Sequence, residues 1–258
     1  MMLVTFDMNQ YLIFLLASCR AAGVIFFNPI FGRSSVPTTL KIGLSLVIAM
    51  FSVYSIGSTQ VIDYTIIEFM GAMLQGFVIG FVIGLIMQSF LAIFQISGEL
   101  IDMQIGLSMA SMYDPASKAN ITATGNMFGA MYVLLFFVSN CHLALINVVI
   151  KSYQVIPVGF GYIDQRVGVF FVELIGYIFL YALQVAIPII VTELIAEFAV
   201  GVMMRLVPNI SVFVINLQLK IIIGLIVILT IIPTLAGFMT KINMIMMEKI
   251  TQILSFFM

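Results

Sequence analysis

Charged residues are scarce in this chain. They make up 8% of its 258 residues, whereas soluble domains carry roughly 25%. Hydrophobic residues account for 63%, and the mean hydropathy is +1.24. This composition excludes a water-soluble globular protein. The formal net charge is −1 and no basic cluster is present, so nothing in the sequence indicates binding to nucleic acid.

Residues that carry out catalysis or bind metals are also rare. The chain has two cysteines and one histidine. Cys19 and Cys141 both lie inside apolar runs, which is typical of small core residues rather than of a disulfide or a metal pair. No cluster with ligand spacing surrounds His142, and no nucleophile elbow, phosphate loop or metal-binding helix motif is present. We therefore expect no metal and no cofactor, and an enzyme that depends on His142 ranks last among the functional hypotheses.

Long apolar runs, by contrast, are abundant, and they predict membrane-spanning helices. A spanning helix needs about 20 largely apolar residues, and the runs do not alternate as strands of a membrane barrel would. The candidate runs are 11–30, 40–57, 66–97, 127–150, 167–192 and 212–240. Pro29, Pro188 and Pro233 interrupt three of them. The sequence thus predicts an all-α integral membrane protein of about six hydrophobic, partly broken helices packed as hairpins, in one membrane-embedded domain over residues 1–258.

Basic residues normally fix the orientation of a membrane protein, because they collect in its cytoplasmic loops. Here they divide evenly: Arg33, Lys41, Lys118 and Arg205 on one side, and Lys151, Arg166, Lys241 and Lys249 on the other. Two explanations stay open: a few loops decide insertion, or partner subunits set the final position of the chain. The first run follows Asp7 and no Lys or Arg, so it lacks the basic start of a signal peptide and should remain as a span.

Three glycines recur at a spacing of four residues in the third run: Gly76, Gly80 and Gly84. This pattern lets helix backbones approach closely. The partner is either another helix of this chain or another subunit, and both alternatives stay open.

Five charged residues lie in or beside the apolar runs: Arg20, Glu193, Glu197, Arg205 and Lys220. A charge at the bilayer centre costs roughly 2.5–3.5 kcal/mol, so each needs a partner or water. Glu193 and Glu197 share one helix face, and neither acid has an obvious basic companion nearby in the sequence. They could form a proton or cation path through a transporter, or polar contacts between helices or between subunits.

One amphipathic segment, residues 98–118, interrupts the apolar sequence with "GELIDMQIGLSMASMYDPASK". As a helix it would place Met109 and Met112 on one face, and Asp114-Pro115 predicts a turn after them. We expect a re-entrant or membrane-boundary hairpin that carries both methionines towards its tip. Methionine re-packs around changing shapes, so the pair is either a soft seal or ordinary packing.

Four stretches of the sequence resemble the FliR family, which comprises the R-type subunits of flagellar export gates and the T-type subunits of injectisomes. They are "RAAGVIFFNPIFGRSSVPTTLKIGLSL", "GLSMASMYDP", "NCHLALINVVIKSYQVIPVG" and "AIPIIVTELIAEFAVGVMMRLVPNISVFVINLQLK". The first matches the family through Arg20, Pro29, Pro37 and Lys41, and the last through Ala186, Pro188, Ala199, Gly201, Arg205, Pro208, Val212, Phe213 and Lys220. The chain departs from the family pattern at Asn140-Cys141-His142, Asn209 and Gln218, which weakens any role for His142.

The resemblance implies a non-enzymatic pore component in the bacterial inner membrane at the flagellar basal body. Its implied partners are the P-type and Q-type subunits (FliP, FliQ), the B-type switch protein (FlhB), the A-type export subunit (FlhA), membrane lipids and the unfolded proteins that pass through. In that family the matching loop projects into the channel as an apolar plug, which here assigns this role to Gly106, Leu107, Met109, Met112, Asp114 and Pro115. In such a gate, Glu193, Glu197 and Arg205 become candidates for pairing between subunits, because they lie at membrane depth and lack obvious partners in the sequence. With Arg20 and Lys220 they form the predicted set of polar contacts between subunits or between helices.

The competing hypothesis is a small-solute or ion transporter that uses Glu193 and Glu197. Such transporters are commonly built from internal repeats, and we find no repeat between residues 1–129 and 130–258. The export hypothesis is therefore preferred. The sequence favours a flagellar system over an injectisome only weakly.

Overall fold

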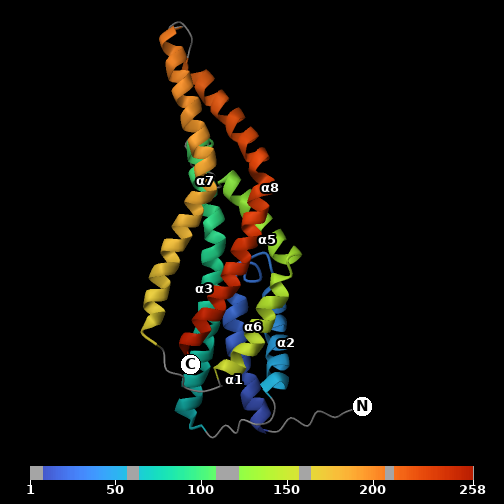
Figure 1. Cartoon of the computed structure of the whole chain (residues 1–258). Helices are drawn as coiled ribbons and strands as arrows, with labels where there is room; N and C mark the ends of the chain where they lie inside the picture. Colours follow the sequence, from blue (N-terminus) through green and yellow to red (C-terminus); the bar gives the residue numbers. More distant parts are fainter. Residues whose placement is uncertain (1–7, 57–63, 109–121, 157–163, 207–211, 258) are drawn as a thin grey trace. The chain divides into compact units, whose positions relative to one another are not determined.

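The computed structural model describes residues 8–56, 64–108, 122–156, 164–206 and 212–257, and every regular element among them is a helix (Figure 1). The helices are α1 (Met8–Phe26), α2 (Thr38–Ile56), α3 (Ile66–Ile105), α5 (Ala123–Val138), α6 (Cys141–Val155), α7 (Arg166–Leu206), α8 (Val212–Leu254) and the short η1 (Ser255–Phe257). Within this part of the chain, 5 helices are long and apolar enough to cross a membrane, or up to 6 spans if the bent pair α5–α6 counts as one. The predicted all-α membrane fold is confirmed.

The fourth predicted run, residues 127–150, forms two helices instead of one. Helices α5 and α6 meet at a bend of 69°. Between them Asn140 adopts the left-handed conformation, with φ 56° and ψ 21°, which asparagine tolerates better than most residues because its short side chain can hydrogen-bond locally. By contrast, α7 and α8 stay helical through Pro188 and Pro233. The break in this run therefore comes from an asparagine rather than from a proline.

Three helices are longer than one membrane crossing requires. Helices α3, α7 and α8 contain 40, 41 and 43 residues, or about 60 Å each at 1.5 Å per residue, roughly twice the hydrocarbon thickness of a bilayer. Residues 98–105 of the predicted amphipathic segment form the last turns of α3. The helix continues through Gly98 and ends before Gly106, whose φ is 89°.

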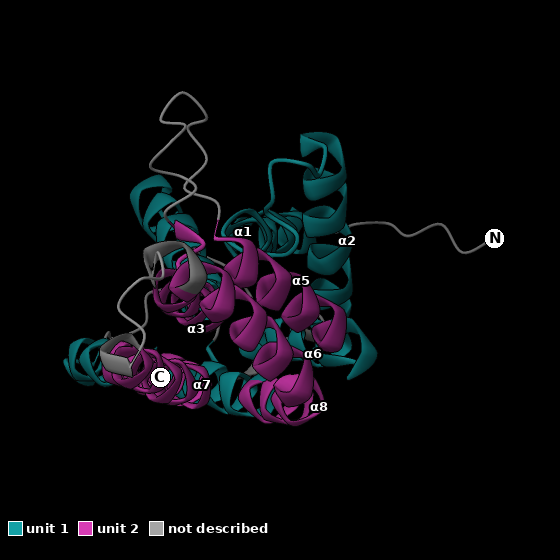
Figure 2. Cartoon of the chain, turned by 90° about the horizontal axis from the view of Figure 1, so that it is seen from above, with its two compact units in different colours: residues 1–89, 137–173, 243–258 teal, residues 90–136, 174–242 magenta. Residues whose placement is uncertain are grey.

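The chain divides into two compact units, coloured separately in Figure 2. The first comprises residues 1–89, 137–173 and 243–258, and the second comprises residues 90–136 and 174–242. Helices α3, α5, α7 and α8 contribute residues to both units.

In the first unit, α1 packs on α2, and α2 packs on α6. The buried residues of α1 recur at helical spacing and include Ile13, Leu16, Ala17, Ala21 and Val24. Two of these are alanines, whose small side chains let a neighbouring helix come close.

In the second unit, aromatic side chains join α3 to α5 and α7 to α8. The ring centroids of Phe94 and Tyr132 are 4.7 Å apart, and those of Tyr181 and Phe238 are 6.0 Å apart. The outer side of α7 remains apolar and uncovered, and Phe198 is 76% exposed. An apolar surface of this kind suits lipid or a protein partner.

Candidate functional site

The proposed plug segment lies only partly within the described residues. Gly106 has a φ of 89°, and a side chain there would meet no atom within 4 Å. Leu107 follows it and is half-buried. Glycine adopts positive φ at no steric cost, so Gly106 is where α3 can stop. The other predicted plug residues lie outside the described residues: Met109, Met112, Asp114 and Pro115.

Asp102 of α3 and Thr124 of α5 connect the helices that precede and follow this segment. Asp102, near the end of α3, is 2% exposed. Its carboxylate accepts a hydrogen bond from the backbone N–H of Thr124 at 3.1 Å and another from the Thr124 hydroxyl. Because the first N–H groups of a helix have no partner within the helix, a carboxylate at this position caps α5. The sequence analysis missed this cap, although an acid ahead of a predicted turn and a threonine at the next helix start were its visible signals.

Glycines bring the same two helices together. A side chain at Gly98 would overlap the backbone of Gly125 and come within 2.8 Å of the Thr124 carbonyl carbon. A side chain at Gly125 would overlap the Thr122 hydroxyl. Helices α3 and α5 therefore touch backbone to backbone at the base of the segment.

The glycines of the third run face α1. A side chain at Gly80 would overlap the Arg20 carbonyl oxygen and come within 2.8 Å of the Val24 nitrogen. At Gly84 it would lie 2.8 Å from Phe27 Cβ, and at Gly76 it would lie 3.5 Å from the Leu16 carbonyl oxygen. Gly23 of α1 completes the contact from the other side, since a side chain there would come within 3.0 Å of Gly80 Cα. The structure thus places these glycines at a helix contact within the chain.

Arg20 lies buried in α1, at 3% exposure, and reaches the end of α6. It donates to Ser152 Oγ at 3.2 Å and to the Ile156 carbonyl oxygen at 3.4 Å, and its guanidinium lies 4.2 Å from the centre of the Tyr153 ring. Tyr153 in turn donates to the Ala17 carbonyl oxygen at 2.7 Å. A cation at a helix C-terminus interacts favourably with the helix dipole, so Arg20 fixes α1 against α6.

Glu197 and Lys220 pair between α7 and α8. Lys220 Nζ lies 3.2 Å from Glu197 Oε2, with the two side chains 17% and 49% exposed. Glu197 therefore has a basic companion within the chain, on a different helix. That companion lies beyond the end of α7, so helical spacing within one helix could not reveal it. Arg205 belongs to α7, but its side chain lies outside what the structure describes.

Glu193 lies one turn before Glu197 and differs from it in both exposure and partners. It is 0% exposed, and neither of its carboxylate oxygens has a hydrogen-bond partner. Its Oε1 lies 3.2 Å from the position that a side-chain Cβ would occupy at Gly224 of α8. The two acids share a helix face, as expected, but only one of them is neutralised.

Other polar groups in the described residues offer no constellation for catalysis or metal binding. No group of three or more His, Cys, Asp and Glu residues there could hold a metal ion. His142 packs its ring 5.3 Å from that of Phe137. At the exposed start of α7, hydrogen bonds from Arg166 lower the pKa of the Asp164 carboxyl below its ordinary value, a local surface contact.

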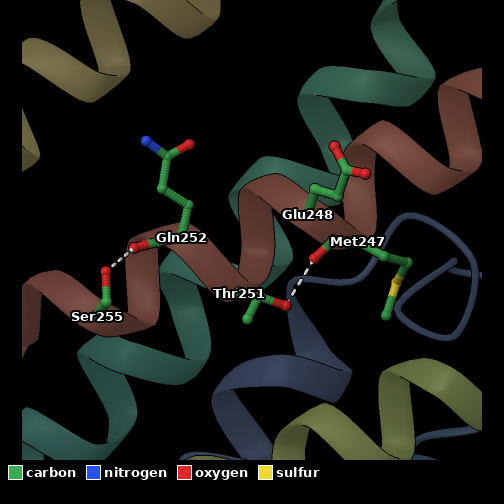
Figure 3. A pocket seen from close by; sticks show the side chains of 5 residues that line it. All are labelled: Met247, Glu248, Thr251, Gln252 and Ser255. Carbon is green, nitrogen blue, oxygen red and sulfur yellow. Dashed lines mark hydrogen bonds between the residues drawn. The ribbon is translucent and has the colours of Figure 1, made fainter.

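A shallow pocket lies along the last turns of α8 (Figure 3). Its two hydroxyl groups are already engaged, because Thr251 donates to the Met247 carbonyl oxygen at 2.9 Å and Ser255 donates to that of Gln252 at 2.7 Å. Both bonds go to backbone carbonyl oxygens of the preceding turn, so neither hydroxyl proton is free for a ligand.

These features define a membrane-embedded, all-α protein whose buried polar groups join helices to one another. Residues 11–245 match the family described as bacterial export proteins, family 1. The chain belongs to this family.

Curated relatives span most of the chain. The flagellar biosynthetic protein FliR of Escherichia coli (strain K12) is 30% identical over 219 residues, which cover 85% of this chain and 84% of the relative. FliR of Bacillus subtilis (strain 168) is 28% identical, with 84% of each chain covered. FliR of Aquifex aeolicus (strain VF5) is 29% identical, with 87% of each covered. The resemblance to the FliR family drawn from the motifs is confirmed.

Proposed function

We propose that this chain is a non-enzymatic pore component of a flagellar type III protein export gate in the bacterial inner membrane. It assembles with P-type and Q-type subunits into a closed channel for unfolded proteins, beside the B-type and A-type subunits. Support comes from the export family and from relatives named as flagellar biosynthetic proteins. The uncovered apolar side of α7 is consistent with contact to lipid or to other subunits.

Within that gate, residues 106–115 act as the apolar plug. The observation that carries this proposal is the fixed base of the segment, where Asp102 caps α5 through Thr124 and the backbones of Gly98 and Gly125 touch. A segment that starts and ends at one rigid contact can change its own conformation without moving the helices around it. Methionine side chains suit a seal that must close when empty and yield to chains of any sequence.

The transporter alternative loses one of its two acids. Glu197 pairs with Lys220, so a coupling site would depend on Glu193 alone. Nothing in the arrangement of the described residues favours a pathway for a small solute over the export gate.

The test is an ion-leak measurement in cells that express the full chain together with its gate partners. We expect a deletion of residues 106–113, and the double variant Met109→Ala with Met112→Ala, to let ions leak where the wild type does not. The matched control is Met50→Ala with Met70→Ala, which removes two exposed methionines from α2 and α3 and should keep the membrane tight.

Assembly is checked in each case by co-purification of the partner subunits. If neither plug variant lets ions leak while the complex is intact, the two methionines only pack against their neighbours, and the proposal of a plug is wrong. Failure of the wild-type chain to co-purify with P-type and Q-type subunits would overturn the assembly itself.

A further inference from the structure

A polar seam runs between α7 and α8, which lie side by side in Figure 1. The two helices run antiparallel, so residues that step by four along one meet residues that step by four along the other. Glu197 faces Lys220, and Glu193, one turn away, faces Gly224. The seam therefore consists of two acids, one base and a glycine.

The Glu193 carboxyl occupies space that the glycine leaves empty. The Glu193 Oε1 atom lies 3.2 Å from where a Cβ of Gly224 would be, and the Ile105 side chain of α3 reaches the same point at 2.5 Å. Glu193 is fully buried there. At that point the nearest side-chain atoms are those of Ile105 and of Glu193 itself, and no described residue donates a hydrogen bond to either Glu193 oxygen.

The charges of the seam do not balance if both acids are ionised. Among the described residues, the charged neighbours of Glu193 are Lys220 and Glu197, and Lys220 is already paired with Glu197. An ionised Glu193 would leave one uncompensated negative charge buried between apolar helices, which is costly. A single proton added to the seam removes that charge.

We propose that the α7–α8 seam is a binding site for one proton and that Glu193 carries it at neutral pH. The ligand is a proton rather than a metal ion, because cations such as Ca²⁺ take 6–8 oxygen ligands and no group of three or more His, Cys, Asp and Glu residues in the described part of the chain could hold a metal ion. The side of the seam at Glu197 is open, with that side chain 49% exposed, which gives the proton a way in and out. Lys220 determines whether the proton is bound. While Lys220 is paired with Glu197, it does not neutralise Glu193, and Glu193 keeps its proton.

The test is infrared spectroscopy of the full chain in lipid bilayers, with the glutamate side-chain carboxyls labelled with carbon-13. The label separates the glutamate bands from the band of the buried Asp102. A neutral glutamic acid shows a carbonyl stretch, which a carboxylate lacks. We expect one such band in the wild type at neutral pH and its loss in Glu193→Gln. The matched control, Glu173→Gln, removes an exposed acid of the same helix and should leave the band unchanged.

Two further variants test the role of the lysine. In Glu197→Gln, Lys220 is released and can neutralise Glu193, so we expect the band to disappear. In Lys220→Met the lysine can no longer neutralise Glu193, which stays buried, so we expect the band to persist. Circular dichroism confirms that each variant keeps its helices.

The outcomes decide the inference in both directions. No glutamic acid band in the folded wild type, or a band that survives Glu193→Gln, would overturn the proton site. A band that persists in Glu197→Gln would overturn the sharing of one lysine between the two acids. None of these results depends on whether the chain forms an export gate.

Discussion

Helices α1 and α3 in the first unit, and α7 and α8 in the second, each meet at a glycine, but different atoms fill the space beside it. At Gly80 the neighbours are backbone atoms of Arg20, Gly23 and Val24. At Gly224 they are the ends of the Ile105 and Glu193 side chains. Backbone can move only if the whole helix moves, whereas a side chain can change rotamer.

The buried charges of the two regions differ in the same way. Arg20 is held by Ser152, Ile156 and the Tyr153 ring. Glu193 has no hydrogen-bond partner at either oxygen. The first region is thus fixed by close approach and by an arginine whose terminal guanidinium nitrogens are hydrogen-bonded, although its Nε has no partner, and the second keeps room for adjustment. We infer that the α1–α3–α6 contact tolerates little change and that the α7–α8 contact tolerates more.

The largest effect is expected for Gly80→Ala. The added methyl group would overlap the Arg20 carbonyl oxygen and lie 2.8 Å from the Val24 nitrogen, so α1 and α3 would have to separate. We expect a loss of about 3 kcal/mol in the free energy of unfolding, at the upper end of the range for overpacking. Thermal unfolding in detergent, followed by circular dichroism, measures the change.

Gly76→Ala is the matched control for Gly80→Ala, one turn earlier on the same helix. Its methyl group would lie 3.5 Å from the Leu16 carbonyl oxygen, an ordinary contact, so stability should stay close to wild type. Helix propensity favours alanine over glycine at both positions, so a loss at Gly76 as large as at Gly80 would show that the close approach at Gly80 does not govern this contact.

The next largest effect is expected for Arg20→Gln. The shorter, neutral side chain loses the hydrogen bonds to Ser152 and Ile156 and the contact with the Tyr153 ring. Hydrogen bonds to charged groups contribute roughly 1.5–3 kcal/mol, and we expect about 2 kcal/mol of destabilisation in the same unfolding measurement. The control is Arg166→Gln at the exposed start of α7, where surface ion pairs contribute little and no measurable change is expected. A loss at Arg166 as large as at Arg20 would contradict the role of burial.

A smaller effect, in the second unit, is expected for Asp102→Asn. The amide keeps one acceptor oxygen and loses the other, so α5 loses part of its cap. We expect about 1 kcal/mol of destabilisation, together with faster hydrogen exchange confined to the first turn of α5. Thr124→Ser, which keeps both donors, should leave that exchange slow; if it exchanges as fast as Asp102→Asn does, the cap is not what holds this turn.

These contacts also show how far the sequence alone could lead. Apolar runs predicted the helices, because a long stretch of apolar residues in lipid must form one, whereas Pro188 and Pro233 lie inside continuous helices. The recurring glycines predicted a close contact but not its partner, since Gly80 meets a helix that begins 72 residues earlier, at Met8. Local spacing carries no information about which helices become neighbours.

The polar residues were harder to interpret for the same reason. Arg20 finds Ser152 at a separation of 132 residues, and Glu197 finds Lys220 only because α7 and α8 pair antiparallel. Once that pairing is known, the register follows directly, because stepping one turn back along α7 and one turn forward along α8 leads from Glu197–Lys220 to Glu193–Gly224. The unpartnered state of Glu193 could not be predicted from composition or periodicity.

The smallest effect is expected for Gly224→Ala, and it tests the comparison most directly. The methyl group would lie 2.5 Å from Ile105 Cδ1 and 3.2 Å from Glu193 Oε1. Both are side-chain ends that can rotate away, so we expect a loss of at most about 1 kcal/mol, the lower end for overpacking. Ile105→Val shortens one of the two neighbours, and combining it with Gly224→Ala should cost less than the sum of the single changes, because residues in contact are coupled. If instead the two changes add, and Gly224→Ala destabilises the chain as much as Gly80→Ala does, then the α7–α8 contact is as rigid as the α1–α3 contact and the distinction between them fails.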